Sequence, residues 1–238
     1  MSIWHTIGRQ LQNPSGFTGR FIGRVMSVAN AKPNQLAINA LRIDPCDTVL
    51  ELGFGPGHAI DAMASQAFAG MVYGIDQSPV MLGQACRRNR RAIREGRVIL
   101  YEAGFEHLPF PDCAIDKLLA VNVIYFWKDA PALLGEIRRV LRPGGRVSIY
   151  ATDATTMRHW KFAGPETHRL YGAAELSAAL QQAGFEKDRI LVRNVHVHRG
   201  VPGLLATVTR PSPRWESAHS SSCENTGSGC RPARDAHG

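Results

Sequence analysis

The sequence predicts an α/β protein with a doubly wound, mostly parallel sheet whose last strand is reversed. Between residues 47 and 184, short runs rich in β-branched and other apolar residues alternate with segments of helical period. Such alternation is typical of strands joined by crossover helices, which makes neighbouring strands parallel. The last two apolar runs, 189–198 and 203–210, are separated by only four residues. So short a link permits a hairpin and not a parallel crossover.

The elements follow one another regularly along the chain. The predicted strands cover residues 48–52, 71–75, 97–101, 114–123 and 146–152. The segments of helical period between and after them cover residues 58–68, 79–94, 131–141 and 173–184. Proline and two glycines at 143–145 mark the stop between the third of these helices and the fifth strand.

Composition divides the chain into three segments. Residues 1–44 are expected to form two or three short amphipathic helices, punctuated by prolines at 14 and 33, as an N-terminal helical cap. Residues 45–210 are expected to form the α/β domain. Residues 211–238 are rich in Ser, Pro, Gly and Arg and almost free of apolar residues, so we expect a disordered tail.

The composition excludes several classes of protein. The 238 residues are 44% hydrophobic and 20% charged, as in ordinary globular proteins. The longest nearly unbroken apolar stretch, 118–127, is far shorter than the roughly 20 residues of a membrane-spanning helix. The first residues lack a signal-peptide pattern, so we expect a cytoplasmic location. The five cysteines contain no closely spaced pair of metal ligands, and no metal is expected.

A glycine-rich turn directly follows the first predicted strand, where Gly53, Gly55 and Gly57 stand in ELGFGPG. Glycines let the backbone turn tightly and approach a ligand, and the helix that follows presents free N–H groups. Asp76 ends the next strand, 19 residues after Gly57, where a carboxylate can accept hydrogen bonds from ribose hydroxyls. We therefore predict a nucleoside cofactor at this edge of the sheet.

The details of the turn favour a cationic cofactor over a dinucleotide. Dinucleotide sites prefer G-x-G-x-x-G, whereas the third glycine comes one residue earlier here. Glu51 stands just before the turn, where a carboxylate repels a pyrophosphate but attracts an ammonium group. A nicotinamide-dependent oxidoreductase is therefore the less favoured alternative.

These motifs resemble those of the class I S-adenosylmethionine-dependent methyltransferases, in particular the small-molecule branch with the type 11 and ubiquinone/menaquinone enzymes. The resemblance covers roughly residues 45–210 and rests on motifs in the same order, ELGFGPG, YGID with QSPVML, FEHLPFPDCAIDKLLAVNVIYFW and LRPGGRVSIY. It implies a Rossmann-like fold, S-adenosylmethionine as cofactor and methyl transfer as the activity.

The resemblance also implies roles for single residues. The ELGFGPG loop, with Glu51, would surround the methionine part of the cofactor, and Asp76 would bind its ribose. Gln77 and Met81 would flank the adenine.

One position departs from the family pattern. The family often has an acidic residue just before LPF that binds the adenine amino group, and Gly104 stands there in this chain. We expect the backbone N–H of Phe105 to contact the ring and Glu102 or Glu106 to replace the carboxylate.

A polar and aromatic run follows the fourth strand, at the edge where doubly wound folds bind ligands. Asn122 is a further candidate for contact with the cofactor, and Tyr125 is a candidate catalytic residue. With Phe126 and Trp127, Tyr125 would form an aromatic wall suited to an apolar or cationic acceptor. The alternative is that these rings only pack beneath the N-terminal helices.

The connection 152–171 is long for a simple link, and such segments are often lids or binding loops. A hydroxyl or protonated amine acceptor benefits from a base near its proton, for which histidine is the usual choice. His159, in this connection, is the candidate base. A surface or packing role for His159 is the alternative.

The expected partner is a small-molecule acceptor, with a lipid or quinone precursor as one form of it. The apolar helix faces of residues 1–26 lie beside arginines, so they suit either peripheral contact with an anionic membrane or docking on the domain itself. Six arginines between 87 and 97 suggest an RNA methyltransferase as the alternative function. No RNA-binding module is appended and no Asn/Asp-Pro-Pro-aromatic signature is present, so RNA is disfavoured, and no DNA partner is expected.

Overall fold

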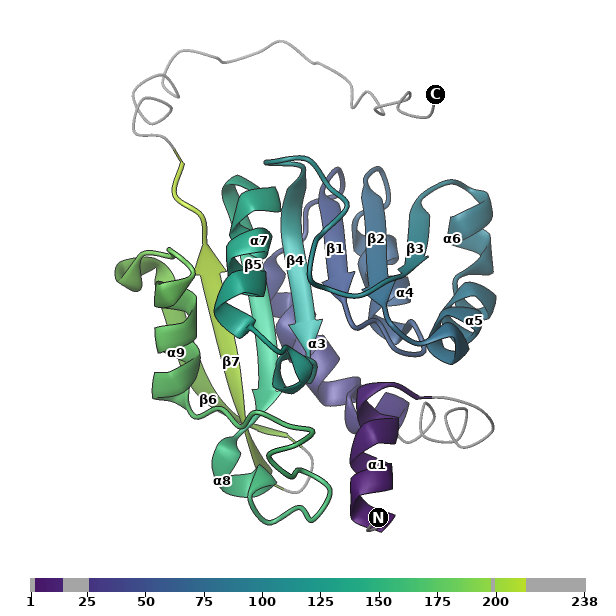
Figure 1. Cartoon of the computed structure of the whole chain (residues 1–238). Helices are drawn as coiled ribbons and strands as arrows, with labels where there is room; N and C mark the ends of the chain where they lie inside the picture. The colour runs from purple at the N-terminus through teal and green to yellow at the C-terminus, as the bar shows by residue number, and fades with distance from the viewer. Residues whose placement is uncertain (1–2, 15–25, 198–199, 213–238) are drawn as a thin grey trace.

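The computed structural model describes residues 3–14, 26–197 and 200–212 and contains a seven-stranded sheet flanked by helices (Figure 1). Its strands are β1 Thr48–Leu52, β2 Met71–Asp76, β3 Val98–Glu102, β4 Ile115–Val121, β5 Leu141–Thr152, β6 Ile190–Val197 and β7 Val201–Thr209. The strand order is β3-β2-β1-β4-β5-β7-β6.

The predicted mostly parallel sheet with a reversed last strand is confirmed. Strands β1 to β5 pair in parallel, whereas β7 is antiparallel to both β5 and β6. From β1 the chain proceeds to β2 and β3 on one side, and β4 and β5 lie on the other. The carboxyl ends of β1 and β4 therefore form a topological switch point, where open α/β sheets leave room for a ligand.

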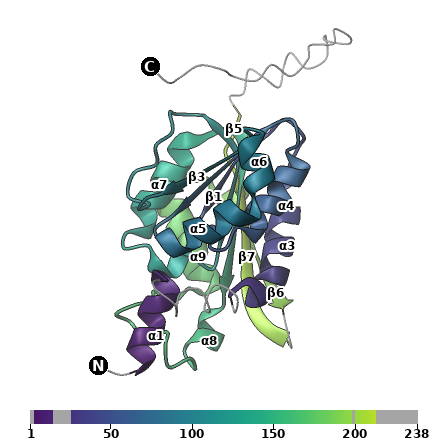
Figure 2. The ribbon, with the colours of Figure 1, turned by 90° about the vertical axis from the view of Figure 1, so that its right-hand side faces the viewer.

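Helices cover both faces of the sheet (Figure 2). One face packs against α3 Ala31–Leu41, α4 His58–Gln66, α5 Pro79–Arg88 and α6 Arg90–Arg94, and the other against α7 Ala130–Val140 and α9 Ala173–Gln182. The central strands contribute to both cores because their side chains alternate: Val49 faces the first group of helices, and Leu50 and Leu52 face the second. Among the described residues, no helix has the length and apolar character needed to cross a membrane.

The predicted N-terminal cap divides into two parts. Helix α3 belongs to the core of the domain, because Ala37, Ile38 and Leu41 are buried against the sheet. Helix α1 Ile3–Gln12 instead lies across the carboxyl edge, beside the segment that follows α8 Ala154–Met157 (Figure 1). Residues 15–25, with part of the predicted amphipathic pattern, and 213–238, most of the predicted tail, lie outside the described residues.

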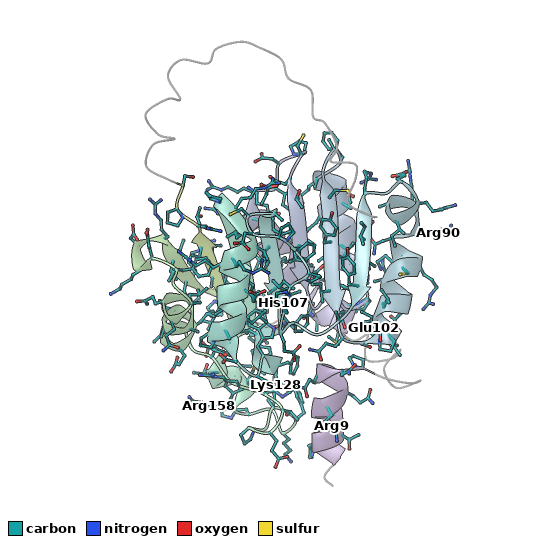
Figure 3. All side chains as sticks on the ribbon, turned by 45° about the horizontal axis from the view of Figure 1, so that its top comes forward. Arg9, Arg90, Glu102, His107, Lys128 and Arg158 are labelled. Carbon is teal, nitrogen blue, oxygen red and sulfur yellow. The ribbon has the colours of Figure 1, made fainter. Side chains whose placement is uncertain are left out.

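Two elements differ clearly from the predicted ones, whereas the other predicted boundaries shift by no more than two residues. The helix expected over 79–94 divides into α5 and α6 at Asn89, whose buried side chain donates hydrogen bonds to the carbonyl oxygens of Gly57 (3.1 Å) and Ala85 (2.9 Å). The exposed face of α6, marked by Arg90 in Figure 3, points away from the sheet. Strand β5 already begins at Leu141, which pairs with Ile115 across a shift in register. The expected stop at 143–145 is therefore an irregular start of that strand.

Arg210 joins the end of β7 to the carboxyl end of α7. Its guanidinium Nη1 donates to the carbonyl oxygens of Arg138 (2.9 Å), Arg139 (3.3 Å) and Leu141. The last carbonyl oxygens of a helix have no hydrogen-bond donor within the helix, so the guanidinium of Arg210 acts as that donor.

Arg210→Met should lower the free energy of unfolding by about 1–3 kcal/mol, since it leaves these carbonyls without their charged donor. Urea denaturation measures the change. The matched control is Arg193→Met on the exposed side of β6, expected to change stability by less than about 0.5 kcal/mol. Equal losses in the two variants would contradict the capping role of Arg210.

Candidate functional site

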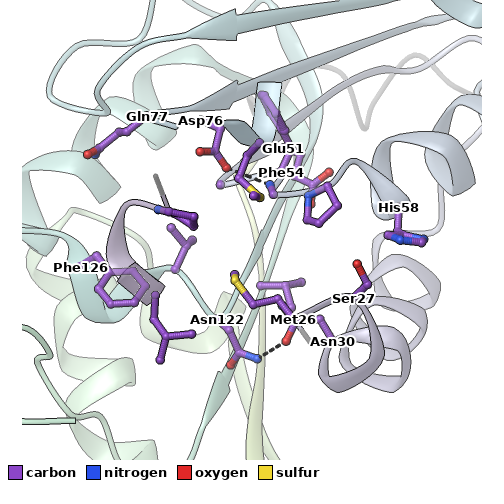
Figure 4. A pocket seen from close by; sticks show the side chains of 18 of the residues that line it. Met26, Ser27, Asn30, Glu51, Phe54, His58, Asp76, Gln77, Asn122 and Phe126 are labelled. Carbon is purple, nitrogen blue, oxygen red and sulfur yellow. Dashed lines mark hydrogen bonds between the residues drawn. The ribbon is translucent and has the colours of Figure 1, made fainter. Parts of the chain in front are cut away.

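A pocket lies at the carboxyl ends of β1, β2 and β4, at the switch point of the sheet (Figure 4). Its walls come from the glycine turn after β1, the end of β2 with the start of α5, and the segment 121–126 after β4. The end of α1 and residues 26–34 complete it from the N-terminal side. Segments distant in the sequence thus meet at the one edge where the parallel strands leave a gap.

The three predicted glycines all adopt left-handed backbone conformations, with φ of 72° at Gly53, 51° at Gly55 and 79° at Gly57. A Cβ on Gly53 would lie 2.7 Å from Val123 Cγ2, and one on Gly57 would lie 2.7 Å from Ala85 Cβ. A Cβ on Gly55 would meet nothing within 4 Å. The outer two glycines therefore allow close packing, whereas Gly55 keeps the pocket wall free of a side chain.

Asp76 fastens this glycine turn to the end of β2. One carboxylate oxygen, Oδ2, accepts a hydrogen bond from the N–H of Gly55 (2.8 Å), and Oδ1 accepts one from the N–H of Ser78 (2.9 Å). Burial raises the pKa of Asp76, and the backbone N–H groups offset part of that rise. The carboxylate both shapes the turn and lines the pocket.

Glu51 places a second buried carboxyl group in the pocket wall. It belongs to β1, and its Oε2 has no hydrogen-bond partner among the described residues. Burial, and secondarily the charge of Asp76, raise the pKa of Glu51 well above its usual range. A buried carboxylate oxygen without a partner is costly unless a donor or a cation is supplied.

The residues predicted to flank an adenine line one end of the pocket. Gln77 follows β2 directly, Met81 is fully buried in the first turn of α5, and Phe105 is buried in the loop after β3. Gln77 and Phe126 lie at the end of the pocket opposite His58 (Figure 4).

The departure at Gly104 has a local explanation. A Cβ there would collide with the carboxylate of Glu106, which lies against the glycine. Glu106 and Glu102 are both exposed, and neither lines the pocket. The pocket therefore has no carboxylate from this loop.

Asn122 and Tyr125 lie in one hydrogen-bonded chain. Asn122 directly follows β4 and has a left-handed φ of 53°, and its Nδ2 donates to Asn30 Oδ1 at 2.8 Å (Figure 4). The Tyr125 hydroxyl donates to Asn122 Oδ1 at 2.8 Å and accepts from the N–H of Thr152. Burial raises the pKa of Tyr125, which lies behind Asn122 and does not line the pocket. Its position is that of a residue that orients Asn122.

His159 is not brought to the pocket; it is exposed in the turn after α8. A different histidine from the same connection, His168, is buried against Phe126, with ring centroids 4.8 Å apart. Its Nδ1 lies 2.9 Å from the Thr167 hydroxyl, and burial lowers the pKa of His168 to about 4. Nothing in the spacing of the sequence distinguishes the two histidines, because tertiary packing decides which one is buried.

The N-terminal segment supplies lining residues that the sequence did not identify. Gln12 at the end of α1, with Asn30 and Asn34, adds neutral amides to the pocket. Gly8 lets helix α1 approach the connection after α8 closely, because a Cβ at this position would overlap the carbonyl of Phe162 and the side chain of Thr167. The amphipathic pattern of this segment indicated its apolar faces and gave no signal for these amides.

Comparisons with known proteins identify the family. A sequence profile for the methyltransferase domain matches residues 50–149. The Bacillus subtilis (strain 168) protein described as an uncharacterized methyltransferase, YdaC, is 32% identical over 190 residues, which cover 80% of this chain and 98% of that protein. This chain belongs to the class I S-adenosylmethionine-dependent methyltransferases.

More distant relatives share the domain. The malonyl-[acyl-carrier protein] O-methyltransferase of Halorhodospira halophila is 28% identical over 155 residues, and the match spans 62% of this chain and 51% of that enzyme. Phosphoethanolamine N-methyltransferase 2 of Haemonchus contortus, solved with S-adenosyl-L-methionine, has a TM-score of 0.69 at 16% identity over 89% of this chain and 61% of its own. An S-adenosylmethionine-dependent methyltransferase from Aquifex aeolicus has a TM-score of 0.61 at 20% identity, over 86% of this chain and 97% of its own.

The predicted family, enzyme class and cofactor are thereby confirmed: the methyltransferase is a transferase with a Rossmann-like fold that uses S-adenosylmethionine. The nicotinamide-dependent oxidoreductase receives no support. Among the described residues there is no group of three or more side chains suited to hold a metal ion.

Replacing Gly57 and Gly55 by alanine should separate the two roles of the turn. Gly55→Ala should cost about 1–2 kcal/mol of unfolding free energy, since only the left-handed backbone is strained. Gly57→Ala should cost about 1–3 kcal/mol more, because its Cβ also overlaps Ala85 of α5. Urea denaturation checks the order, and a loss in Gly55→Ala as large as that in Gly57→Ala would contradict it.

Glu51→Gln should stabilise the ligand-free protein at pH 7 by about 1 kcal/mol, because ionising Glu51 opposes folding. The pKa of Glu51 is raised in the folded state, so its destabilising effect is full above that pKa and vanishes as the pH falls below its ordinary 4.5. Unfolding free energies of both proteins between pH 4 and pH 8 test this. The gain should shrink toward acid pH, and a gain independent of pH would contradict the assignment.

Proposed function

We propose that the pocket holds S-adenosylmethionine through Asp76 and Glu51 and that the methyl group passes to a small-molecule acceptor. The observation that carries the proposal is the pair of buried carboxyl groups at the carboxyl ends of β1 and β2, beside a glycine turn that leaves space at Gly55. The cofactor, when bound, supplies a methyl group already activated on a sulfonium centre.

The residues present fit this cofactor. Asp76 accepts one backbone hydrogen bond on each oxygen, from Gly55 in the turn and from Ser78 at the start of α5, and its remaining lone pairs are available to ribose hydroxyls. The unpartnered Oε2 of Glu51 suits the ammonium group of the amino-acid end. Gln77, Met81 and Phe105 provide an apolar and amide-lined end for adenine.

The opposite side of the pocket suits an acceptor whose reacting end is uncharged. The amides of Gln12, Asn30, Asn34 and Asn122 line it, and the described lining residues include no lysine or arginine. Relatives named for action on malonyl-[acyl-carrier protein] and on 27-O-demethylrifamycin SV support acceptors of small-molecule chemistry. A lipid or quinone precursor is one form of this class.

The chain contributes mainly alignment and exclusion of water. Asn122 is oriented by Tyr125 and Asn30, so its amide is fixed before any acceptor enters. Helix α1 and the connection after α8 pack together over the carboxyl edge, and exclusion of water from that edge is the role we assign to them. In-line displacement at an activated methyl group needs no protein nucleophile, which agrees with a described lining that contains no cysteine, lysine or tyrosine.

Calorimetry with S-adenosylhomocysteine tests the cofactor site. Wild-type protein should bind it with a dissociation constant in the micromolar range, about −8 kcal/mol. Asp76→Asn should bind at least about tenfold more weakly, because the amide both loses the charge and turns a donor toward the N–H of Gly55 or Ser78. Glu106→Gln, an exposed neighbour outside the pocket, is the control and should bind like wild type.

Two results would contradict the proposal: binding of NADH in place of the sulfur nucleoside, or an unchanged affinity in Asp76→Asn. The acceptor class has a separate test, in which methyl-labelled S-adenosylmethionine is incubated with a small-molecule extract and with total RNA. Label should enter the small-molecule fraction, and label in RNA alone would favour the RNA methyltransferase.

A further inference from the structure

A second hollow opens beside the cofactor pocket, at the start of α4 and the end of α5. It is lined by Ser27, Val28, Pro56, His58, Asp61, Gln84, Arg87 and Arg88. Ser27, Pro56 and His58 line both cavities, so the two adjoin each other. Figure 4 places His58 at the end of the pocket opposite Gln77 and Phe126, and the hollow is therefore reached from that end.

The structure divides the basic segment 87–97 into two parts. Glu95 forms ion pairs with Arg91 (2.8 Å) and Arg97 (2.6 Å), so one carboxylate offsets part of the positive charge at the far end of the segment. Arg87 and Arg88, in the last turn of α5, are exposed and form no ion pair with any carboxylate of the described residues. Two unneutralised guanidinium groups thus border the hollow.

Two further polar side chains line the same space. Gln84 Nε2 is buried and has no hydrogen-bond acceptor among the described residues. His58 adds an imidazole, and burial together with the charge of Arg88 lowers its pKa, so the ring is neutral at pH 7 and can donate one hydrogen bond. Guanidinium and imidazole donors around one space suit the oxygens of a phosphate group.

We propose that this hollow is a subsite for a phosphate-class group carried by the methyl acceptor, an inference that rests on the proposed function. The acceptor would place its uncharged reacting end in the main pocket and its anionic group between Arg87 and Arg88. The hollow measures about 710 Å³, which is ample for such a group and the part of the molecule next to it.

The arrangement favours one anionic group over an extended polyanion such as RNA. Only Arg87 and Arg88 of the six arginines in the segment line the hollow, and Asp61 bounds it with a negative charge. Arg90, by contrast, points away from the body of the molecule (Figure 3).

The test is calorimetric titration of inorganic phosphate into the full chain saturated with S-adenosylhomocysteine, with potassium chloride at matched ionic strength as the blank. Wild type should bind one phosphate per chain. The double variant R87Q/R88Q should bind it at least about tenfold more weakly. The matched control R90Q/R94Q removes the same charge from the same segment outside the hollow and should weaken binding less than about threefold.

Three outcomes of this titration would overturn the subsite: no saturable binding by wild type, equal weakening in both double variants, or competition between phosphate and S-adenosylhomocysteine. The last would assign the hollow to the cofactor. Because the affinity for S-adenosylhomocysteine is measured first, on the same protein without phosphate, failure of the cofactor proposal is seen independently of the phosphate result.

A separate experiment tests whether the methyl acceptor carries the phosphate group. Methyl-labelled S-adenosylmethionine is supplied with a small-molecule extract, untreated or treated with phosphatase. Labelling should fall at least about fivefold after phosphatase treatment and in R87Q/R88Q, and not in R90Q/R94Q. Labelling that is unchanged by phosphatase would show that the hollow does not bind a phosphate group of the acceptor. Labelling of RNA that both double variants weaken equally would instead identify an extended polyanion as the acceptor.

Discussion

The buried carboxylate of Asp76 is the constraint on which the site depends. It ends β2 and accepts hydrogen bonds from the N–H groups of Gly55 and Ser78, so it fixes the turn after β1 and the start of α5 at once. The glycines of that turn then allow α4 to approach α5, where any larger residue at 57 would meet Ala85. The hydrogen bond from Gly55 to Asp76 fixes this turn at the wall of the pocket, and the switch point between β1 and β4 stays open.

Burying the carboxyl groups of Glu51 and Asp76 in the wall of the pocket opposes folding. Burial raises the pKa of both Glu51 and Asp76, and the charge of Asp76 raises that of Glu51 further. Asp76 is offset by backbone donors, whereas Glu51 Oε2 has none among the described residues. In our account a cationic, hydroxyl-bearing nucleoside supplies the missing hydrogen-bond partners. The unpartnered carboxyl group therefore lowers the stability of the ligand-free protein but favours binding of that ligand over others.

The parts of this structure that depend on local sequence could be predicted. The alternation of apolar β-rich runs with helical segments predicted the parallel sheet, and the four residues between the last two apolar runs predicted the reversed β7. The ELGFGPG turn with Asp76 indicated the edge of the sheet that carries the pocket. The parts set by long-range packing could not. The division of α5 from α6 depends on a bond from Asn89 to Gly57, 32 residues away, and the contact of Asn122 with Asn30 spans 92 residues. Likewise, periodicity cannot tell that His168 is buried and His159 exposed.

The most direct measurement is a crystal structure of the full chain with S-adenosylhomocysteine. Our account predicts the ribose hydroxyls on Asp76, the amino group within hydrogen-bonding distance of Glu51, and the adenine among Gln77, Met81 and Phe105. The backbone at Gly55 should lie against the nucleoside without a change in the turn. A nucleoside bound elsewhere, or one that leaves Asp76 and Glu51 without contact to it, would contradict the account.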